Sequence, residues 1–314
     1  MKKVKQIKLR RGMTASQLIK EMDACGVLGA GKMGKAAKLI AKMFADPDYT
    51  VFLTLAGALV PGGLRGIIAE LIEHGYVNVL ITTGANMVHD LVEALGFSHE
   101  IGVFEVQDEQ LKNKEIGRIG DIYIQHKAFQ ELEKWLHHLL KELTEQECQR
   151  ISPSSLLQKI GTQISQKDSI LAAAARKEVP VICPGLPDSI IGFQLWTWSS
   201  SDKKLVLDSL GDISKLVDEV YQARKSGIII LGGGWPKHFT LFANTFREGV
   251  DTAVQITMDR PEPGGLSGAT LKEAISWRKV KSNENTATVI CDATIAFPLI
   301  VAAVLEEAQA LREF

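Results

Sequence analysis

The sequence has no long apolar run and no strong excess of charge of either sign. No segment approaches the roughly 20 apolar residues that are needed to cross a bilayer, and the basic start "MKKVKQIKLRRG" lacks the apolar core of a signal peptide. The formal net charge of −1 gives no electrostatic reason to expect nucleic acid or an anionic membrane as a partner. We therefore expect a protein that binds neither.

Cysteine is scarce as well. The four cysteines are scattered, with no C-x-x-C pair and no histidine nearby at the spacing of a metal ligand: Cys25, Cys148, Cys183 and Cys291. This pattern argues against a disulfide framework and against a structural zinc site, so no metal is expected. A reducing, cytoplasmic location fits best.

The 314 residues are 46% hydrophobic, enough for a sizeable core. Short β-rich apolar runs alternate with segments of helical period. Continuous apolar strands separated by helices predict an α/β fold, with a mainly parallel sheet covered by helices on both faces. We expect an N-terminal helical arm over 1–48 and a single domain over 49–314. The expected strands lie within 50–55, 77–83, 179–185, 203–210, 226–234, 251–259 and 286–294.

The stretch "CGVLGAGKMGKAA" contains a literal G-x-G-x-x-G at Gly29, Gly31 and Gly34. A dinucleotide-binding loop needs a strand before its first glycine and an acidic residue about 20 positions later, on the next strand. Here a helical pattern precedes Gly29, and the acidic candidates fall before the first convincing strand. We interpret the stretch as a glycine-bearing link between two helices.

Three later segments place small residues directly after apolar strands: "LTLAGALVPGG", "LITTGANMVHD" and "IIILGGGWPKHF". Ligands of open α/β sheets bind beyond the carboxyl ends of the strands, where glycine lets backbone N–H groups approach a phosphate. Any one of these segments alone is more typical of a tight turn, whereas the three together suggest a nucleotide site as readily as they suggest turns. Asp188 and Asp292 also follow apolar runs, and either binds a ribose hydroxyl or caps the next helix.

Two further segments carry candidate catalytic groups. His238 closely follows the triple glycine and is a candidate base, or else a structural histidine. In "GGLSGATLKEAISWRKVK", Trp277 beside Lys279 suggests an apolar wall that makes the amine a nucleophile for imine chemistry. The alternative is a solvated Arg-Lys pair at the end of a helix.

At "EAISWRKV" and "ILGGGWPKH" the sequence resembles deoxyhypusine synthase. The resemblance extends through "TVFLTLAGALVPGGLRGII", "VNVLITTGANMVHDL", "GRIGDIYI", "VPVICPGLPDSIIG" and "VICDATIAFPLIVA", in the family's order and spacing. It implies a Rossmann-like fold, a homotetramer and NAD as cofactor. It also implies transfer of an aminobutyl group from spermidine, through an imine on a lysine, to a lysine of a translation factor.

The resemblance also implies roles for individual residues. Lys279 matches the nucleophile of the family's S-W-G-K motif, and His238 matches a histidine that contacts the polyamine. Glu273 and Trp277 match residues that line the amine tunnel. For NAD, the matching positions are residues 57–61, which begin with Gly57 and Ala58 and end with Pro61. The others are Thr83, Gly84, Ala85, Asp188, Gly233, Met258, Asp259, Asp292 and Ala293.

Several positions depart from the family. Val88 and His89 replace a pair of glutamates, and Phe193 and Leu266 each replace an aspartate, so carboxylates that hold a polycation are missing. Burying an ammonium group without its counter-charge costs several kcal/mol. His89 also takes the place of a residue that contacts NAD, and it is kept as a substrate-binding candidate. Further replacements are Ala58 for an asparagine and Arg278 for the glycine of the motif.

These departures leave donor and acceptor open and count against spermidine. One reading is a deoxyhypusine synthase-like transferase that acts on a protein lysine. A second is a homospermidine synthase-like enzyme that acts on small amines. A third is a non-catalytic homologue that binds NAD or another metabolite.

Overall fold

The computed structural model describes residues 2–201 and 204–312. These residues form two compact units. Unit 1 comprises the described residues of 1–56, 76–81 and 215–314, and unit 2 comprises those of 57–75 and 82–214. Each unit is described by itself.

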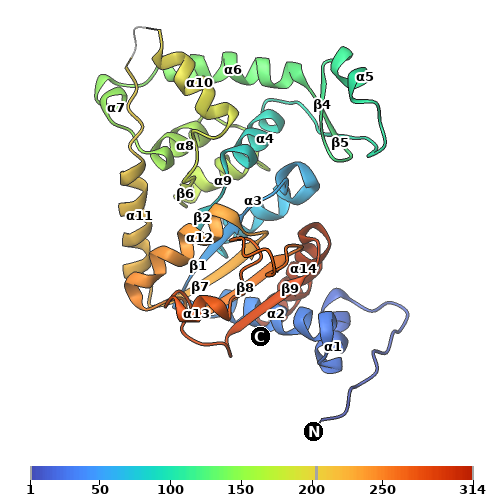
Figure 1. Cartoon of the computed structure of the whole chain (residues 1–314). Coiled ribbons are helices and arrows are strands. Elements are labelled where there is room, and N and C mark those ends of the chain that lie inside the picture. Colours follow the sequence, from blue (N-terminus) through green and yellow to red (C-terminus); the bar gives the residue numbers. More distant parts are fainter. Residues whose placement is uncertain (1, 202–203, 313–314) are drawn as a thin grey trace. The chain divides into compact units, whose positions relative to one another are not determined.

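Unit 1 is built on parallel strands that run side by side in the order β2-β1-β7-β8-β9 (Figure 1). All residues of β8 are buried, as are six of the seven in β7. Strands covered on both faces have continuous apolar sequences, which is why these runs lack an apolar–polar alternation. The predicted α/β fold with a parallel sheet is confirmed. The strands are β1 (Tyr49–Leu55), β2 (Val79–Ile81), β7 (Lys225–Leu231), β8 (Thr252–Thr257) and β9 (Thr286–Ile290).

Helices of unit 1 pack against this sheet. Helix α2 (Leu28–Ala45) contacts β1, β8 and β9, and α14 (Ala293–Arg312) contacts β8 and α2. Helix α12 (Gly234–Ala243) follows β7 and contacts β1. Helix α13 (Glu273–Ser276) is a single turn that precedes β9. The short helix η2 (Asn244–Arg247) joins α12 to the segment before β8.

The three glycines of the apparent fingerprint lie inside α2, which helix α1 (Ala15–Cys25) precedes. They do not form the link between the helices that the sequence suggested. A Cβ on Gly31 would lie 2.4 Å from the carbonyl carbon of Gly26, and one on Gly34 would lie 2.3 Å from Cβ of Asp23. These glycines therefore let α1 and α2 approach closely.

Unit 2 is mostly helical, with a small antiparallel sheet in the order β3-β5-β4. A buried carboxylate joins three of its helices: Asp90 on α4 accepts hydrogen bonds from Arg65 on α3 and from Ile170 N at the start of α9. The main helices are α3 (Arg65–Glu73), α4 (Gly84–Ala94), α6 (His126–Leu140), α8 (Pro153–Thr162), α9 (Ile170–Arg176) and α10 (Ile190–Ser199). The shorter elements are η1 (Val60–Leu64), β3 (Glu100–Ile101), α5 (Asp108–Asn113), β4 (Ile116–Ile119), β5 (Ile122–Gln125), α7 (Glu145–Gln149) and β6 (Val181–Ile182).

Helix α11 (Ser209–Gln222) contains the last residues of unit 2 and the first of the final segment of unit 1. The described residues of 1–48 group with the sheet of unit 1, against which α2 packs. A domain boundary at residue 48 stays a prediction. No helix in the described part of the chain is both long enough and apolar enough to cross a membrane.

Candidate active site

A cavity of about 330 Å³ lies within unit 1, between α12 and the segment around α13. It brings together four residues that the sequence singled out, Lys279, His238, Glu273 and Trp277, and also Leu266. The other lining residues are Lys237, Leu241, Phe242, Thr245, Gly264, Ala269, Thr270 and Ala274.

The segment that carries Lys279 is held by its backbone. Lys279 N donates to Ala274 O (3.0 Å), which ends α13, and Lys279 O accepts from Val250 N (3.0 Å). The side chain is half-buried, and its Nζ lies 5.4 Å from the centroid of the Trp277 ring. Trp277 is 66% exposed, so it flanks the amine on one side, and the desolvating wall that the sequence suggested stays a prediction. Arg278 is exposed, so of the Arg-Lys pair it is Arg278 that is solvated.

Arg278 has a left-handed backbone conformation, with φ of +54°. Glycine adopts this conformation without steric cost, whereas other residues rarely adopt it. The family motif has glycine at this position, so the replacement keeps the backbone turn and adds strain to it. The turn is what directs Lys279 to the cavity after a helix of only four residues.

His238 is half-buried on α12 and stacks on Phe242, with 5.9 Å between the ring centroids. Burial lowers the pKa of His238, and the charge of Lys279 lowers it further. The neutral imidazole is therefore the favoured form at pH 7, and it can accept a proton.

Lys237 was missed in the sequence. Its side chain is only 4% exposed, yet it lines the cavity. Burial lowers the pKa of Lys237 to about 8, with Glu273 acting against the shift and Lys279 adding to it. Helical spacing is the signal that could have found it. Positions 237, 241 and 245, each four residues apart, fall on one side of α12 and its extension and all line the cavity.

The predicted cofactor residues of unit 1 follow three neighbouring strands at their carboxyl ends. Gly233 follows β7, Asp259 follows β8, and Asp292 with Ala293 follows β9. Asp259 and Asp292 are exposed. Asp292 Oδ1 accepts from Thr294 N (2.7 Å) and so caps α14, the second of its two predicted roles. A Cβ on Gly233 would lie 2.4 Å from Cα of Ser267, so this glycine allows a close loop contact.

The remaining predicted cofactor residues belong to unit 2. Gly57 and Ala58 are exposed, and Gly57 has a φ of +97° with open space where a Cβ would point. Thr83 caps α4 by accepting from Asn86 N (3.4 Å). Gly84 is buried and Ala85 is exposed in the first turn of that helix. Asp188 is exposed and precedes α10, whose cap is Ser189 and not Asp188.

His89 also lies in unit 2, on α4, in a chain of polar contacts. Its Nδ1 lies 2.8 Å from Nε2 of His99, whose Nδ1 lies 2.6 Å from Oε1 of Glu93. Burial lowers the pKa of His89 to about 4, and the neighbouring His99 adds to this shift. The His89 ring also lies edge-on to Phe129, with 6.3 Å between the ring centroids, and a role in substrate binding stays a prediction.

The replaced acidic positions have distinct environments. Leu266 lines the cavity of unit 1, where it places an apolar side chain instead of a carboxylate. In unit 2, Val88 is buried in α4 and Phe193 is exposed on α10. Among the described residues that line the cavity, Glu273 is the only carboxylate. Over the same described ranges, no three His, Cys, Asp or Glu side chains gather in a way that would hold a metal ion.

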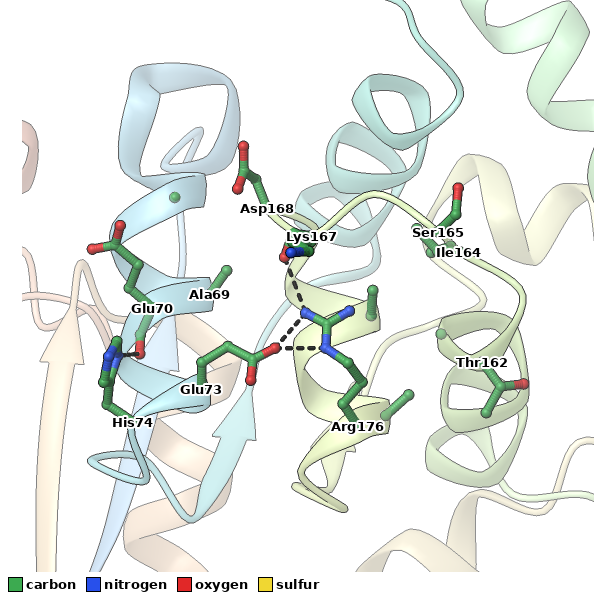
Figure 2. A pocket seen from close by; sticks show the side chains of 14 residues that line it. Ala69, Glu70, Glu73, His74, Thr162, Ile164, Ser165, Lys167, Asp168 and Arg176 are labelled. Carbon is green, nitrogen blue, oxygen red and sulfur yellow. Dashed lines mark hydrogen bonds and ion pairs between the residues drawn. The ribbon is translucent and has the colours of Figure 1, made fainter.

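A second cavity of about 780 Å³ lies within unit 2, between α3 and the segment that leads into α9 (Figure 2). None of the residues predicted from the sequence lines it. Within it Glu73 binds Arg176, which also donates to Lys167 O. Other lining residues are charged, such as Glu70 and Asp168, or small, such as Ala69 and Ala172. The chemistry of the predicted site is therefore in the smaller cavity.

The fold and the cavity together define an α/β protein with lysine, histidine and glutamate side chains in one pocket. The family described as deoxyhypusine synthase matches residues 17–304. The protein described as probable deoxyhypusine synthase of Methanothermobacter thermautotrophicus is 43% identical over 97% of this chain and 98% of its own. The protein described as probable deoxyhypusine synthase 1 of Archaeoglobus fulgidus is 42% identical over 95% and 96%. The chain belongs to the deoxyhypusine synthase family, a family of transferases.

Solved structures show the same fold. A crystal structure of a protein described as deoxyhypusine synthase from Entamoeba histolytica matches with a TM-score of 0.67 and 21% identity, over 94% of each chain. The ternary complex of AgrE with ornithine and NAD+ matches with a TM-score of 0.54 and 12% identity, over 90% of this chain and 34% of AgrE. At these identities the likeness concerns the fold alone.

Proposed function

We propose that this chain is an NAD-dependent transferase that moves an aminobutyl-type group from an amine donor, through an imine on Lys279, to an acceptor amine. Membership of the deoxyhypusine synthase family supports transfer from a polyamine to a protein lysine. The observation that carries the proposal is the cavity in which Lys279 meets His238, Glu273 and Trp277.

The residues of the cavity suit capture of an imine. The Lys279 amine, when uncharged, adds to the carbon of a C=N bond, and the amine that held this carbon leaves with the proton. The lysine then holds the carbon chain as an imine. An acceptor amine displaces Lys279 in the same way, which restores the free lysine. His238, favoured in its neutral form, accepts and returns the protons that these exchanges move.

The residues present fit NAD. The exposed carboxylate of Asp259 follows the parallel strand β8, and a carboxylate at such a strand end accepts hydrogen bonds from ribose hydroxyls. In unit 2, Gly57 leaves open space at its backbone. When bound, NAD would supply oxidation by accepting hydride from the carbon next to the donor nitrogen, and reduction by returning it.

The test is to trap the lysine adduct. The protein is incubated with NAD and, separately, spermidine, putrescine or agmatine, then treated with borohydride, which reduces an imine to a stable amine. We expect the mass of an aminobutyl-type group on Lys279 by intact mass and peptide sequencing. Lys279→Ala should form no adduct yet bind NAD in calorimetry. Lys279→Arg should fail too, because a guanidinium stays charged.

Lys272→Ala is the matched control, since Lys272 is an exposed lysine at the start of α13 that does not line the cavity. It should form the adduct at the wild-type level. Reduction of NAD without an adduct would exclude Lys279 as the nucleophile. Neither NADH nor an adduct with any amine would favour the non-catalytic, metabolite-binding reading instead.

A parallel reaction without borohydride distinguishes the two acceptors, because only the unreduced imine can pass to a second amine. Transfer of the group to a translation factor would support a protein lysine, and transfer to putrescine would support a homospermidine synthase-like reaction. The replacement by Leu266 within the cavity disfavours a polycationic donor. We also propose that the protein works as a cytoplasmic homotetramer, for which sedimentation would give about four times the 34.4 kDa of one chain.

A further inference from the structure

Lys237 is held more tightly than the other cations of the cavity. Its Nζ donates to three oxygens: Ala269 O (2.5 Å), Gln255 Oε1 (3.1 Å) and Ser267 O (3.4 Å). Three acceptors match the three donors of an ammonium group. Lys237 lies on α12 and Gln255 on β8, whereas the two carbonyls belong to the loop between β8 and α13.

This loop is held to the sheet by further polar contacts. Gln255 Nε2 donates to Ser267 O (2.8 Å) and to Gly232 O (3.0 Å), and Ser267 Oγ accepts from Gly234 N (2.9 Å). Residues 265 and 266 are exposed, and 267–269 are half-buried. Of the four hydrogen bonds named here that tie Ser267 and Ala269 to the sheet and α12, Lys237 donates two.

The loop continues directly into the segment that carries the proposed nucleophile. Ala274 N donates to Thr270 O (3.2 Å), and Lys279 N donates to Ala274 O (3.0 Å). Because these two hydrogen bonds connect the loop to α13 and α13 to Lys279, a displacement of Ala269 would also displace α13.

We propose that Lys237 is a positioning residue whose ammonium group fixes the loop 265–269 and thereby the wall of the cavity that carries Glu273 and Lys279. The role in catalysis rests on the proposed function, whereas the attachment of the loop does not. Lys237 does not react with substrate. It acts through the backbone that it holds.

The attachment is expected to depend on pH. The charged groups that face Lys237 are Glu273, Asp259 and Lys279, and burial lowers its pKa to about 8. Opening of the loop would expose the amine to water and return its pKa toward the ordinary 10.5, so the open loop binds more protons than the closed loop between these values, and closure is favoured as the pH rises.

Hydrogen exchange of the full-length chain tests the attachment. In Lys237→Met, which keeps the length of the side chain but removes its donors, amides of residues 268–274 should lose protection at least about tenfold at pH 7, the effect of losing one or more charged hydrogen bonds. Lys225→Met is the control, because Lys225 pairs with Asp46 (2.7 Å) at the far end of β7. It should leave protection of 268–274 unchanged.

A pH series gives the second readout. After correction for intrinsic exchange, wild-type protection of 268–274 should rise between pH 7 and pH 9, whereas Lys237→Arg should show no such rise because its charge persists. If Lys237→Met does not fold, the arginine series decides the question. Unchanged protection in a folded Lys237→Met, or the same pH dependence in wild type and Lys237→Arg, would overturn the proposal.

Trapping with amine and borohydride then tests the catalytic consequence. Lys237→Met should slow adduct formation on Lys279 at saturating amine while NAD binding persists. If the wild-type protein forms no adduct, the proposed transferase activity is refuted. The attachment of the loop is still tested in that case, because hydrogen exchange needs no turnover.

Discussion

At the scale of a residue, Arg278 replaces the glycine of the family's motif and keeps the left-handed backbone turn, which lowers the stability of the folded chain. Its φ of +54° costs a non-glycine residue on the order of 1 kcal/mol. We predict that Arg278→Gly raises the free energy of unfolding in urea, by up to about 1 kcal/mol because the freer unfolded chain offsets part of the gain. Adduct formation on Lys279 should persist.

Lys272→Gly provides the comparison for this prediction. Lys272 is also an exposed cation beside α13, but its φ is −67°, so glycine relieves no strain there. That variant should be less stable than wild type, by up to about 1 kcal/mol. Equal effects of the two substitutions would show that the left-handed turn is not strained.

At the scale of an element, a glycine outside the motif fixes the segment of Lys279. Gly249 has a φ of +104°, and a Cβ there would lie 2.8 Å from the carbonyl carbon of Lys279 and from Val280 N. The two segments are joined by hydrogen bonds between Val250 and both Lys279 and Lys281. They cannot separate without losing these bonds.

We predict that Gly249→Ala lowers the free energy of unfolding by about 2 kcal/mol or more and reduces trapping of the adduct at a temperature where the variant is folded. Chemical denaturation and borohydride trapping measure the two effects. Gly29→Ala is the control, since Gly29 lies in a helix with no atom within 4 Å of the added Cβ. It should be neutral or stabilising. If Gly249→Ala has the stability and the adduct formation of the wild type, the prediction is wrong, and the segment of Lys279 can move to accommodate the added methyl group.

At the scale of the whole molecule, His89 makes stability depend on pH. Because its folded pKa of about 4 lies below the ordinary 6.5, the folded chain binds fewer protons than the unfolded chain between these values. The stability that the neutral form of His89 gives the folded chain is fully present above about pH 6.5. It is lost as the pH falls toward 4, which lowers the free energy of unfolding by at most about 3 kcal/mol. His89→Gln should therefore lose less stability than wild type between pH 7 and pH 4.5 in urea titrations.

The control for this prediction is His74→Gln, because His74 is exposed and lies outside the contacts of His89 with His99 and Glu93. It should keep the acid sensitivity of the wild type. The same sensitivity in His89→Gln would assign the effect to other groups of the chain.

The sequence by itself determined the fold class and the core of the candidate site. Both depend on local signals: apolar runs that only a covered parallel strand tolerates, and the short segment that holds Glu273, Trp277 and Lys279. His238 was identified because it follows a glycine-marked strand end. These residues are close in sequence to the turns that place them, so their pattern is visible before folding.

Tertiary structure alone decided which side chains complete the cavity and what the glycines do. Lys237 appears in the sequence as one more helical cation, and only the folded chain brings two loop carbonyls and Gln255 of β8 to its ammonium group and removes water. In the same way, Gly31 and Gly34 fit the sequence pattern of a phosphate-binding loop, but in the structure they permit close contact between α1 and α2. Burial and hydrogen bonds between segments distant in sequence depend on packing, and packing leaves no periodic signal in the chain.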